Sequence, residues 1–368
     1  MTYSQLKAIA RKSVYMEHEK DTLPVVLATM LANRLDTHPV WLMIIAGPSS
    51  GKTIFINALQ LCQEGIMVSM LTPKTLISGA KNRDTVDGKE ASLMAKIDGK
   101  VMLIKDASTI TEMNKNTRAE VFSQLRTAFD GTLEKDSGLG RKVFKAKFGI
   151  ILAGTSTLEK VRTFESSLGE RFINFRPCPE DYDKVNALSN LNREIEGQLA
   201  IELAEAVAEY LDSAGVPKNL PVPHQIAQHA QLLVSLRAGV SRDPYGKWID
   251  QPADDGIESP YRVSKQLGAM YSSLCHVTNN KHTALAITKR LALDSVPYVR
   301  MRLMQCLQAG LVRQADIIRS MKMSETAVVM LVGGMEALGI LETKATSNSK
   351  KVRLIPKYKK LFNLCTRI

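Results

Sequence analysis

Three short apolar segments punctuate the first half of the chain, and each has about the length of one β-strand. They are Val40–Ala46, Lys100–Asp106 and Lys147–Ala153. Apolar runs of this length are typical of strands buried within a parallel sheet, and the stretches between them carry helical patterns. The pattern therefore predicts an α/β fold in which a parallel sheet lies between helices.

The segments on either side of this region also have helical patterns. Met1–Lys20 predicts an amphipathic helix, and Pro177–Asn280 is mostly helical. Within the latter, Asn192–Leu211 is rich in Glu, Ala and Leu, which favour helix formation. Pro217–Pro223 and Asp243–Pro260 are rich in Pro, Gly and Asp. The middle of the chain is therefore expected to be helical and interrupted by two loops.

The C-terminal quarter predicts three helices followed by a β-hairpin. Ser324 is the expected N-cap of the third helix, and a polar turn separates the two strands. A helix, a helix-turn-helix and a hairpin in this order predict a winged helix-turn-helix. In chain order the expected elements are Val299–Leu311, Gln314–Met321, Ser324–Leu338, Ile340–Ala345 and Lys351–Ile355.

The positive charge of the protein is concentrated in that same quarter. The 368 residues carry a net charge of +12. Lys281–Ile368 accounts for +11 of it, with 16 Lys and Arg against 5 Asp and Glu. A basic module attached to a nearly neutral one indicates a polyanion partner, and we expect DNA rather than a membrane. The alternative is a basic face that only keeps the protein in solution.

Cysteine usage and hydropathy exclude several classes of protein. The five cysteines are far apart and include no CxxC pair, which argues against a disulfide framework and against a zinc site. No apolar run approaches the roughly 18 residues that cross a bilayer. The N-terminal residues also lack the apolar core of a signal peptide. We therefore expect a cytoplasmic protein with no membrane partner.

The first apolar segment runs into AGPSSGKT, residues 46–53. A strand, a glycine-rich loop ending in Gly-Lys-Thr, and a helix from Ile54 to Gln60 are the context of a phosphate-binding loop. Lys52 would neutralise the β- and γ-phosphate oxygens, and the Thr53 hydroxyl would ligate Mg²⁺. The sequence therefore predicts a site for ATP and magnesium. The residues expected to bind ATP are Gly47, Ser49, Ser50, Gly51, Lys52 and Thr53.

The second apolar segment, KVMLIKD, ends in Asp106, where a Walker B carboxylate would face the metal. The usual following glutamate is absent, because Ala107 stands there. In one register Asp106 holds Mg²⁺ and the general base comes from elsewhere. In the other, Asp106 takes the place of the base and Lys105 replaces the metal ligand. We prefer the first register, because a lysine beside Mg²⁺ would repel it.

The third apolar segment ends in GTST, residues 154–157. A hydroxyl at the end of a strand beside the P-loop strand could orient the attacking water or contact the γ-phosphate, and we assign this role to Thr155. The alternative is an ordinary turn, which glycine and hydroxyl residues favour by themselves.

In their order these motifs resemble those of the AAA+ superfamily, and within it the minichromosome-maintenance (MCM) helicases. The resemblance covers about Val40–Val277. It rests on AGPSSGKT, KVMLIKD, the stretch from LRTAFDGT to ILAGTST (residues 125–157), and LGERF (residues 168–172). It implies an AAA+ core with a helical lid and subunits that assemble into a ring, which we expect to be hexameric. Fewer than 40 residues precede this core, so the chain looks more like a replication ATPase of a phage or mobile element than a cellular MCM protein.

The resemblance also implies roles for individual residues. In MCM-like proteins a β-hairpin before the sensor-1 strand carries cations into a central channel, and Thr132–Lys145 matches this hairpin. Arg171 matches the arginine finger that completes a neighbouring subunit's ATP site. Arg262 or Lys265 matches the sensor-2 residue, and Thr155 or Ser156 stands where the family has a sensor-1 asparagine. The hairpin residues expected to contact DNA are Lys135, Arg141 and Lys142.

Four domains follow from these assignments: a helical extension (1–38), an AAA+ core (39–178), a helical lid (179–290) and a winged helix (291–368). The expected wing carries Lys344, Lys350, Lys351 and Arg353, a pattern that favours phosphate contacts over base readout. The alternative is a winged helix that docks onto a protein.

The predicted function is a ring-shaped, ATP-dependent DNA helicase or translocase that acts in DNA replication. Its expected catalytic residues are Asp106, Thr155, Arg171 and Arg262. Further partners would be a replication initiator, a primase or a separate protein that supplies the N-terminal domain. One alternative is an ATP-gated initiator or helicase loader with little hydrolysis, which the missing glutamate favours. Another is a transcriptional activator, which the lack of a GAFTGA-like loop disfavours.

Overall fold

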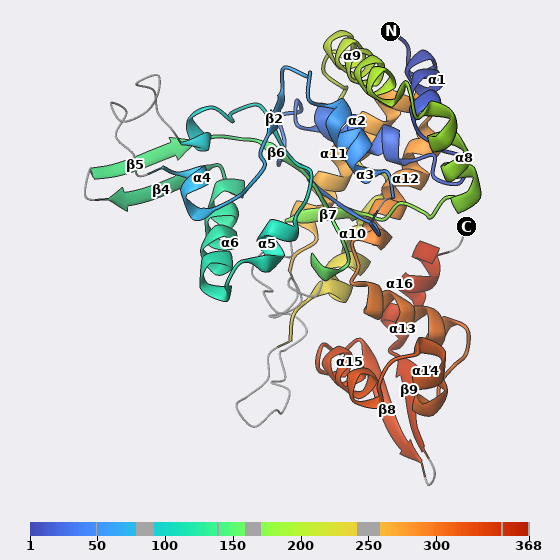
Figure 1. Cartoon of the computed structure of the whole chain (residues 1–368). Coiled ribbons are helices and arrows are strands. Elements are labelled where there is room, and N and C mark those ends of the chain that lie inside the picture. Colours follow the sequence, from blue (N-terminus) through green and yellow to red (C-terminus); the bar gives the residue numbers. More distant parts are fainter. Residues whose placement is uncertain are drawn as a thin grey trace. The chain divides into compact units, whose positions relative to one another are not determined.

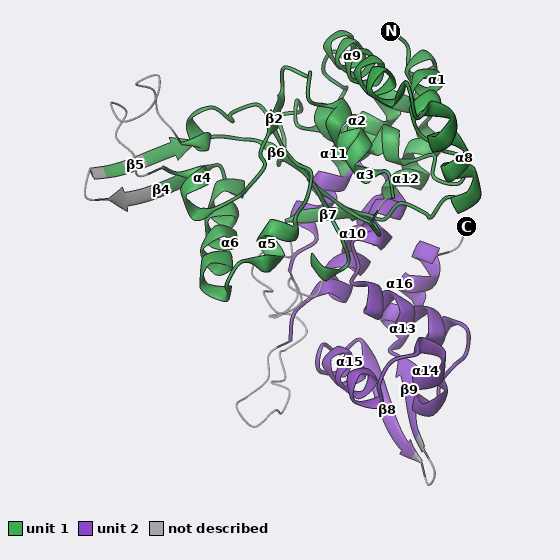
Figure 2. Cartoon of the chain, in the orientation of Figure 1, with its two compact units in different colours: residues 1–221, 268–288 green, residues 222–267, 289–368 purple. Residues whose placement is uncertain are grey.

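The chain folds into two compact units (Figures 1 and 2). The computed structural model describes residues 1–48, 50–78, 92–137, 140–158, 171–240, 258–346 and 349–366. Unit 1 contains residues 1–221 and 268–288, and unit 2 contains residues 222–267 and 289–368. Helices α11 (Tyr261–Thr278) and α12 (Lys281–Asp294) cross the boundaries between them. This division differs from the four predicted domains, because the expected extension and part of the expected lid belong to the same unit as the sheet.

Unit 1 is built on a five-stranded parallel sheet with the strand order β2-β3-β6-β1-β7. The three predicted strands are confirmed as β1, β3 and β6, and β6 lies between the other two. β2 and β7 were not predicted. The strands are β1 (Trp41–Ile45), β2 (Gly65–Met67), β3 (Val101–Ile104), β6 (Gly149–Gly154) and β7 (Phe172–Phe175).

Helices flank both faces of this sheet, which makes the fold a mixed α/β fold compatible with a P-loop-like core (Figure 1). Helices α4, α5 and α6 supply the buried side chains on one face, and α2 and α3 lie against the other. The helices of unit 1 other than α11 and α12 are α1 (Tyr3–Ser13), α2 (Thr22–Ala32), α3 (Lys52–Ala58), α4 (Pro73–Leu76), α5 (Ser108–Glu112), α6 (Lys115–Phe129), α8 (Tyr182–Asn192) and α9 (Glu196–Ala214), with a 3-10 turn at Leu93–Ala95.

Helix α2 lies inside unit 1, although the sequence placed it in an extension outside the core. All of its residues are buried, as expected for a helix that is apolar on every side. The Asn33 amide that follows it donates to the carbonyl of Val40 at 3.1 Å and accepts from the Val40 N–H at 3.0 Å. These bonds fix the residue directly before β1, so α2 helps to position the strand that leads into the P-loop.

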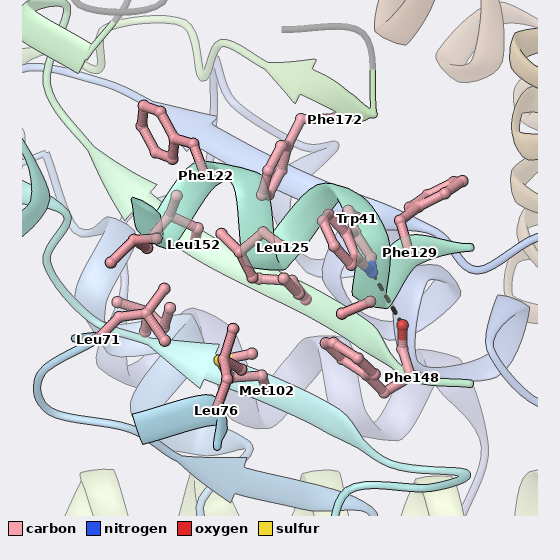
Figure 3. Close-up of a cluster of buried hydrophobic side chains, with 14 of the residues drawn as sticks. Trp41, Leu71, Leu76, Met102, Phe122, Leu125, Phe129, Phe148, Leu152 and Phe172 are labelled. Carbon is pink, nitrogen blue, oxygen red and sulfur yellow. Dashed lines mark hydrogen bonds between the residues drawn. The ribbon is translucent and has the colours of Figure 1, made fainter. Parts of the chain in front are cut away.

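Large aromatic side chains fill the sheet face that α6 covers (Figure 3). Trp41 meets the Phe129 ring edge-on, with 5.0 Å between centroids, and its indole N–H donates to the Phe148 carbonyl at 2.9 Å. The Phe172 ring lies 5.3 Å from Trp41. Buried aromatic pairs of this geometry stabilise a core beyond the area they bury. The cluster therefore fixes the end of α6 against the amino ends of β1 and β7.

A separate antiparallel hairpin lies between α6 and β6, as predicted. Its strands are β4 (Thr132–Ser137) and β5 (Gly140–Lys145). The junction with α6 is Gly131, whose φ of +90° suits glycine, and its carbonyl accepts the Ala146 N–H at 3.1 Å. Leu133 is buried at the base of the hairpin. Figure 1 shows the hairpin extending away from the sheet of unit 1.

Unit 2 contains the elements predicted for the C-terminal quarter. The helix predicted at Gln314–Met321 has these bounds, and the Ser324 hydroxyl accepts the Ala327 N–H at 3.3 Å, which confirms the N-cap. Ile317, Val328 and Val352 are buried between the helices and the hairpin. The elements are α10 (His224–Arg237), α13 (Tyr298–Gln308), α14 (Gln314–Met321), α15 (Glu325–Ala337), β8 (Leu341–Thr346), β9 (Ser349–Leu354) and α16 (Pro356–Thr366).

Within the described ranges, no helix combines the length and apolar character needed to cross a membrane.

Candidate nucleotide site and DNA-contact hairpins

Three predicted motifs meet at one edge of the sheet, because the strands that carry them are parallel neighbours. The Ala46 N–H donates to the Gly154 carbonyl at 3.1 Å, and the Ala107 N–H donates to the Ala153 carbonyl at 2.8 Å. The chain therefore leaves β1, β6 and β3 at the same level. The P-loop, Thr155 and Asp106 all follow these strands at their carboxyl edge, where open parallel sheets bind ligands.

The loop after β1 enters α3 through a glycine in the left-handed region. Gly51 has a φ of +75° and directly precedes α3, which begins at Lys52, two residues earlier than the sequence predicted. A Cβ placed on Gly47 would meet no atom within 4 Å, so this side of the loop is open. Ser50 and Thr53 are exposed, whereas Ser49 lies outside the described residues.

Lys52 carries the charge of this loop. Its ammonium donates to the Gly47 carbonyl at 2.7 Å. Partial burial lowers the pKa of Lys52, and the charge of Asp106 acts in the opposite direction without cancelling the effect. The charge of Asp106 thus acts on Lys52, as expected for residues that follow strands of the same sheet at its carboxyl edge.

Asp106 is an exposed carboxylate held in one orientation. It accepts hydrogen bonds from the Ser108 N–H at 2.9 Å and from the Ser108 hydroxyl at 2.8 Å. Ser108 was not predicted from the sequence, although a serine two residues after an aspartate is a common partner in such turns. The exposure of Asp106 leaves the carboxylate accessible to a metal-bound triphosphate.

Position 107 faces the interior rather than the P-loop. Ala107 is 1% exposed, and a Cβ placed on Gly154 would lie 3.3 Å from the Ala107 Cβ. A glutamate at 107 would therefore have to displace packed atoms of β6 before it could reach the site. Asp106, which is exposed, is therefore the residue at the end of β3 whose carboxylate can reach the site in either of the two registers.

The residues at this edge fit ATP and Mg²⁺ by their chemistry. Lys52 supplies a cation, Thr53 and Thr155 supply hydroxyls, and Asp106 supplies the carboxylate oxygen that Mg²⁺ prefers. Gly47 leaves one side of the loop open, as a phosphate requires. A triphosphate held by the loop would thus face Asp106 and Thr155 of the same subunit.

Arg171 lies at the opposite edge of the sheet. It directly precedes β7, and the first residue of β7, Phe172, pairs with Trp41, the first residue of β1. The Arg171 side chain is only 9% exposed, and its guanidinium lies 3.5 Å from the Asp130 carboxylate and 5.6 Å from the centre of the Phe129 ring. Within one subunit, Arg171 and the P-loop therefore lie at opposite ends of the strands. The preceding three residues of LGERF lie outside the described residues.

Arg262 belongs to unit 2, at the start of α11. Its guanidinium pairs with Glu258, which also accepts from Arg237 at 2.7 Å. The Lys265 ammonium lies 4.3 Å from the centre of the Tyr261 ring. The role of Arg262 in sensing nucleotide stays a prediction.

The β4–β5 hairpin distributes its cations unevenly. The register places Lys135 directly opposite Lys142 and Asp136 opposite Arg141. The side chains of the two lysines lie outside the described residues. Arg141 forms an ion pair with Glu134, which the sequence analysis did not single out.

The β8–β9 hairpin also has two faces. Side chains alternate along a strand, so Lys351 and Arg353 lie on the face opposite the buried Val352. Lys344 pairs with Lys351 across the ladder and shares this face. Lys350 lies on the other face, with its ammonium 3.9 Å from the Glu336 carboxylate of α15. Three of the four predicted cations therefore form one basic surface, and the fourth is neutralised.

Helix α15, the third predicted helix of the C-terminal quarter, presents an uncharged stripe to solvent. Val329 and Met330 are 44% and 41% exposed, and Thr326 is exposed beside them. This agrees with the low charge that the sequence indicated for this helix. The basic surface of unit 2 thus lies on the hairpin rather than on α15.

Comparison with models of known protein families and with curated proteins finds no match to this chain.

Proposed function

We propose that the chain is an ATP-driven DNA helicase or translocase of the MCM-like AAA+ type, which acts as a hexameric ring in the replication of a phage or mobile element. The observation that carries this proposal is the position of the β4–β5 hairpin. It stands directly before β6, the strand between the P-loop strand and the Asp106 strand. A change at the ATP site would thus act on the strand that follows the hairpin.

The residues at the sheet edge support ATP as the ligand. The P-loop would bind the triphosphate, Lys52 would neutralise its terminal oxygens, and Thr53 with Asp106 would hold Mg²⁺ or the attacking water. Thr155 would orient that water from the end of β6. ATP supplies the phosphoryl group whose transfer to water releases energy for movement.

The two hairpins support DNA as the partner. In the Lys135–Lys142 and Lys344–Lys351 pairs, one cationic position faces another across the ladder. Contacts of this kind bind phosphates without reading bases, and they weaken as salt rises. On this proposal the first hairpin moves DNA and the winged-helix hairpin of unit 2 holds it.

The position of Arg171 supports a shared ATP site. An arginine at the amino edge of the sheet cannot reach a phosphate at the carboxyl edge of its own sheet, because β1 alone extends about 16 Å at 3.3 Å per residue. In a head-to-tail ring, the amino edge of one subunit can face the P-loop of the next. Arg171 would therefore complete the neighbour's site, once its side chain leaves Asp130.

A subunit-mixing experiment tests this proposal. Lys52→Ala and Arg171→Ala should each abolish ATP hydrolysis by the full chain. Mixed in equal amounts, they should regain activity, because about a quarter of the interfaces in a random heterologous ring pair an intact P-loop with an intact arginine. Lys52→Ala mixed with Asp106→Asn is the matched control and should stay inactive, since both changes affect the same half of the site. Failure of the first mixture to regain activity would refute the shared site.

The position of Ala107 favours a second candidate, an ATP-gated DNA-binding initiator or helicase loader. Ala107 is buried where a glutamate is expected, so the site lacks the usual base in the register in which Asp106 holds Mg²⁺. Such a protein would assemble on DNA with ATP and hydrolyse it at a negligible rate. ATP-dependent assembly without turnover, with or without DNA, would favour this candidate over a motor.

A further inference from the structure

The base of the β4–β5 hairpin and the Arg171 side chain are in direct contact. Asp130 is the C-cap of α6, and the hairpin begins two residues later, at Thr132. The Arg171 guanidinium lies 3.5 Å from the Asp130 carboxylate and over the Phe129 ring. One short segment of α6 thus links the element expected to contact DNA with the arginine expected to contact a neighbouring subunit.

Asp130 and Phe129, which both contact Arg171, differ in how firmly they are held. Phe129 is 4% exposed and packs against Trp41 in the aromatic cluster (Figure 3), so its position is fixed by the core. The Asp130 side chain is 63% exposed, and the next residue, Gly131, has a φ of +90° with open space where a Cβ would lie. A displacement of the hairpin about Gly131 would therefore move Asp130 more than Phe129.

The ion pair itself is weak enough to exchange. A pair in which one partner is largely exposed contributes little to stability, because water competes for the carboxylate. Arg171 can therefore leave Asp130 for a more strongly charged acceptor, such as a phosphate of a neighbouring subunit. When Arg171 leaves, the Asp130 carboxylate at the end of α6 loses this partner. Coupling of this kind is reciprocal between the two sites.

We propose that Asp130 is a positioning residue, which holds Arg171 at the hairpin base so that DNA on the β4–β5 hairpin controls the release of Arg171 toward the next subunit. This inference rests on the proposed function, because it needs Arg171 to act at a neighbour's ATP site. The link between hairpin and Arg171 is nevertheless a property of one chain. It can be measured without hydrolysis.

The test uses the full chain and two readouts. The protein contains two tryptophans, and Trp248→Phe leaves Trp41, which contacts Phe129, as the only one. Trp248 lies outside the described residues. In this background, emission from Trp41 is recorded as a single-stranded oligonucleotide is added. The second readout is the ratio of ATP turnover with and without the oligonucleotide.

Asp130→Ala should bind the oligonucleotide as the parent does but lose the Trp41 response. Its ratio of ATP turnover with and without the oligonucleotide should fall by about fivefold to tenfold, the lower part of the range for coupling between sites. Asp130→Glu should restore both. Glu202→Ala is the control, because Glu202 forms a partly exposed ion pair with Lys12 elsewhere in unit 1, and it should leave both readouts unchanged.

The outcomes separate this inference from the proposed function. A Trp41 response and a stimulation ratio that survive Asp130→Ala would overturn the inference and leave the proposed function intact. A parent that hydrolyses no ATP would overturn the motor, and the Trp41 response would still decide the inference. Equal losses in Asp130→Ala and Asp130→Glu, in step with a lower unfolding temperature, would show a structural role only and would also overturn it.

Discussion

The β4–β5 and β8–β9 hairpins belong to different units, and yet they repeat one pattern of charge. In each, the register of the ladder pairs one lysine with another, and it pairs an acidic residue with an arginine at a second position. The pairs are Lys135–Lys142 and Asp136–Arg141 in the first hairpin, and Lys344–Lys351 and Glu342–Arg353 in the second. The hairpins therefore offer the same chemistry to a polyanion.

What differs is the connection at the base of each hairpin. The first joins α6 at Asp130, the partner of Arg171, and runs into β6 beside the P-loop strand. The second is tied to α15, where Glu336 accepts from the Thr343 N–H at 3.0 Å and from its hydroxyl at 2.6 Å. We infer that one hairpin transmits nucleotide changes to DNA, whereas the other only holds DNA.

The largest expected effect distinguishes the role of the ATP site in turnover from the role of the two hairpins in DNA binding. Lys52→Ala should lower ATP turnover by about 100-fold or more, because it removes the cation that stabilises charge in the transition state. DNA affinity should stay within about twofold, since the change leaves both hairpins intact. Turnover assays and oligonucleotide binding check the two parts. Lys74→Ala, an exposed lysine of α4, is the control. Loss of DNA binding in Lys52→Ala alone would contradict the separation.

The next largest effect tests the β4–β5 hairpin, which we expect to transmit nucleotide changes to DNA. The double variant Lys135→Ala/Lys142→Ala should lower affinity for single-stranded DNA and reduce the slope of log affinity against log salt by about 1.4, at roughly 0.7 for each phosphate that a lysine no longer neutralises. It should also remove DNA stimulation of ATP turnover at saturating DNA. A stimulated rate that recovers fully at saturating DNA would show that this hairpin only holds DNA.

The β8–β9 hairpin, which we expect only to hold DNA, should respond differently. Lys344→Ala/Lys351→Ala should reduce the salt slope by a similar amount, about 1.4, and leave the stimulated rate at saturating DNA unchanged. Lys350→Ala is the matched control, because Glu336 already neutralises this lysine on the other face of the hairpin. Equal losses of affinity from the double variant and from Lys350→Ala would contradict the assignment of the basic surface.

The smallest expected effect concerns Arg141, which Glu134 neutralises. Arg141→Ala should lower DNA affinity less than the lysine double variant does, because it removes one cation rather than two. Glu134→Ala should raise the affinity, since it releases the guanidinium. Both values come from titrations at one fixed salt concentration. A larger loss in Arg141→Ala than in the lysine double variant would reverse the order of the cations.

Local pattern predicted much of the fold in advance. The strands at Trp41–Ile45, Val101–Ile104 and Gly149–Gly154 are continuous apolar runs, and a polar turn separates the strands of the β8–β9 hairpin. The β4–β5 hairpin, in contrast, was expected from the resemblance to MCM-like proteins. The short strand Gly65–Met67 was missed because three residues show no period. The position of α2 within unit 1 was missed, because an apolar helix indicates that it is buried but does not indicate which element it packs against.

The candidate site was predictable where each residue directly follows a strand of the parallel sheet. The P-loop, Asp106 and Thr155 each follow a strand, so parallel pairing brings them together. Long-range partners could not be predicted. The contact of Arg171 with Asp130 joins residues 41 positions apart, and the inward position of Ala107 depends on packing against β6.

The central claim, that DNA on the β4–β5 hairpin drives ATP turnover, is tested most directly by the rate of ATP hydrolysis of the full chain. The rate is measured without DNA and with saturating single-stranded or double-stranded oligonucleotides, for the natural sequence and for Lys135→Ala/Lys142→Ala. The account predicts that DNA raises the rate of the natural sequence by about fivefold or more, a typical coupling between two sites, and leaves the double variant at its basal rate. Robust hydrolysis by the natural sequence that ignores DNA of either form would contradict it.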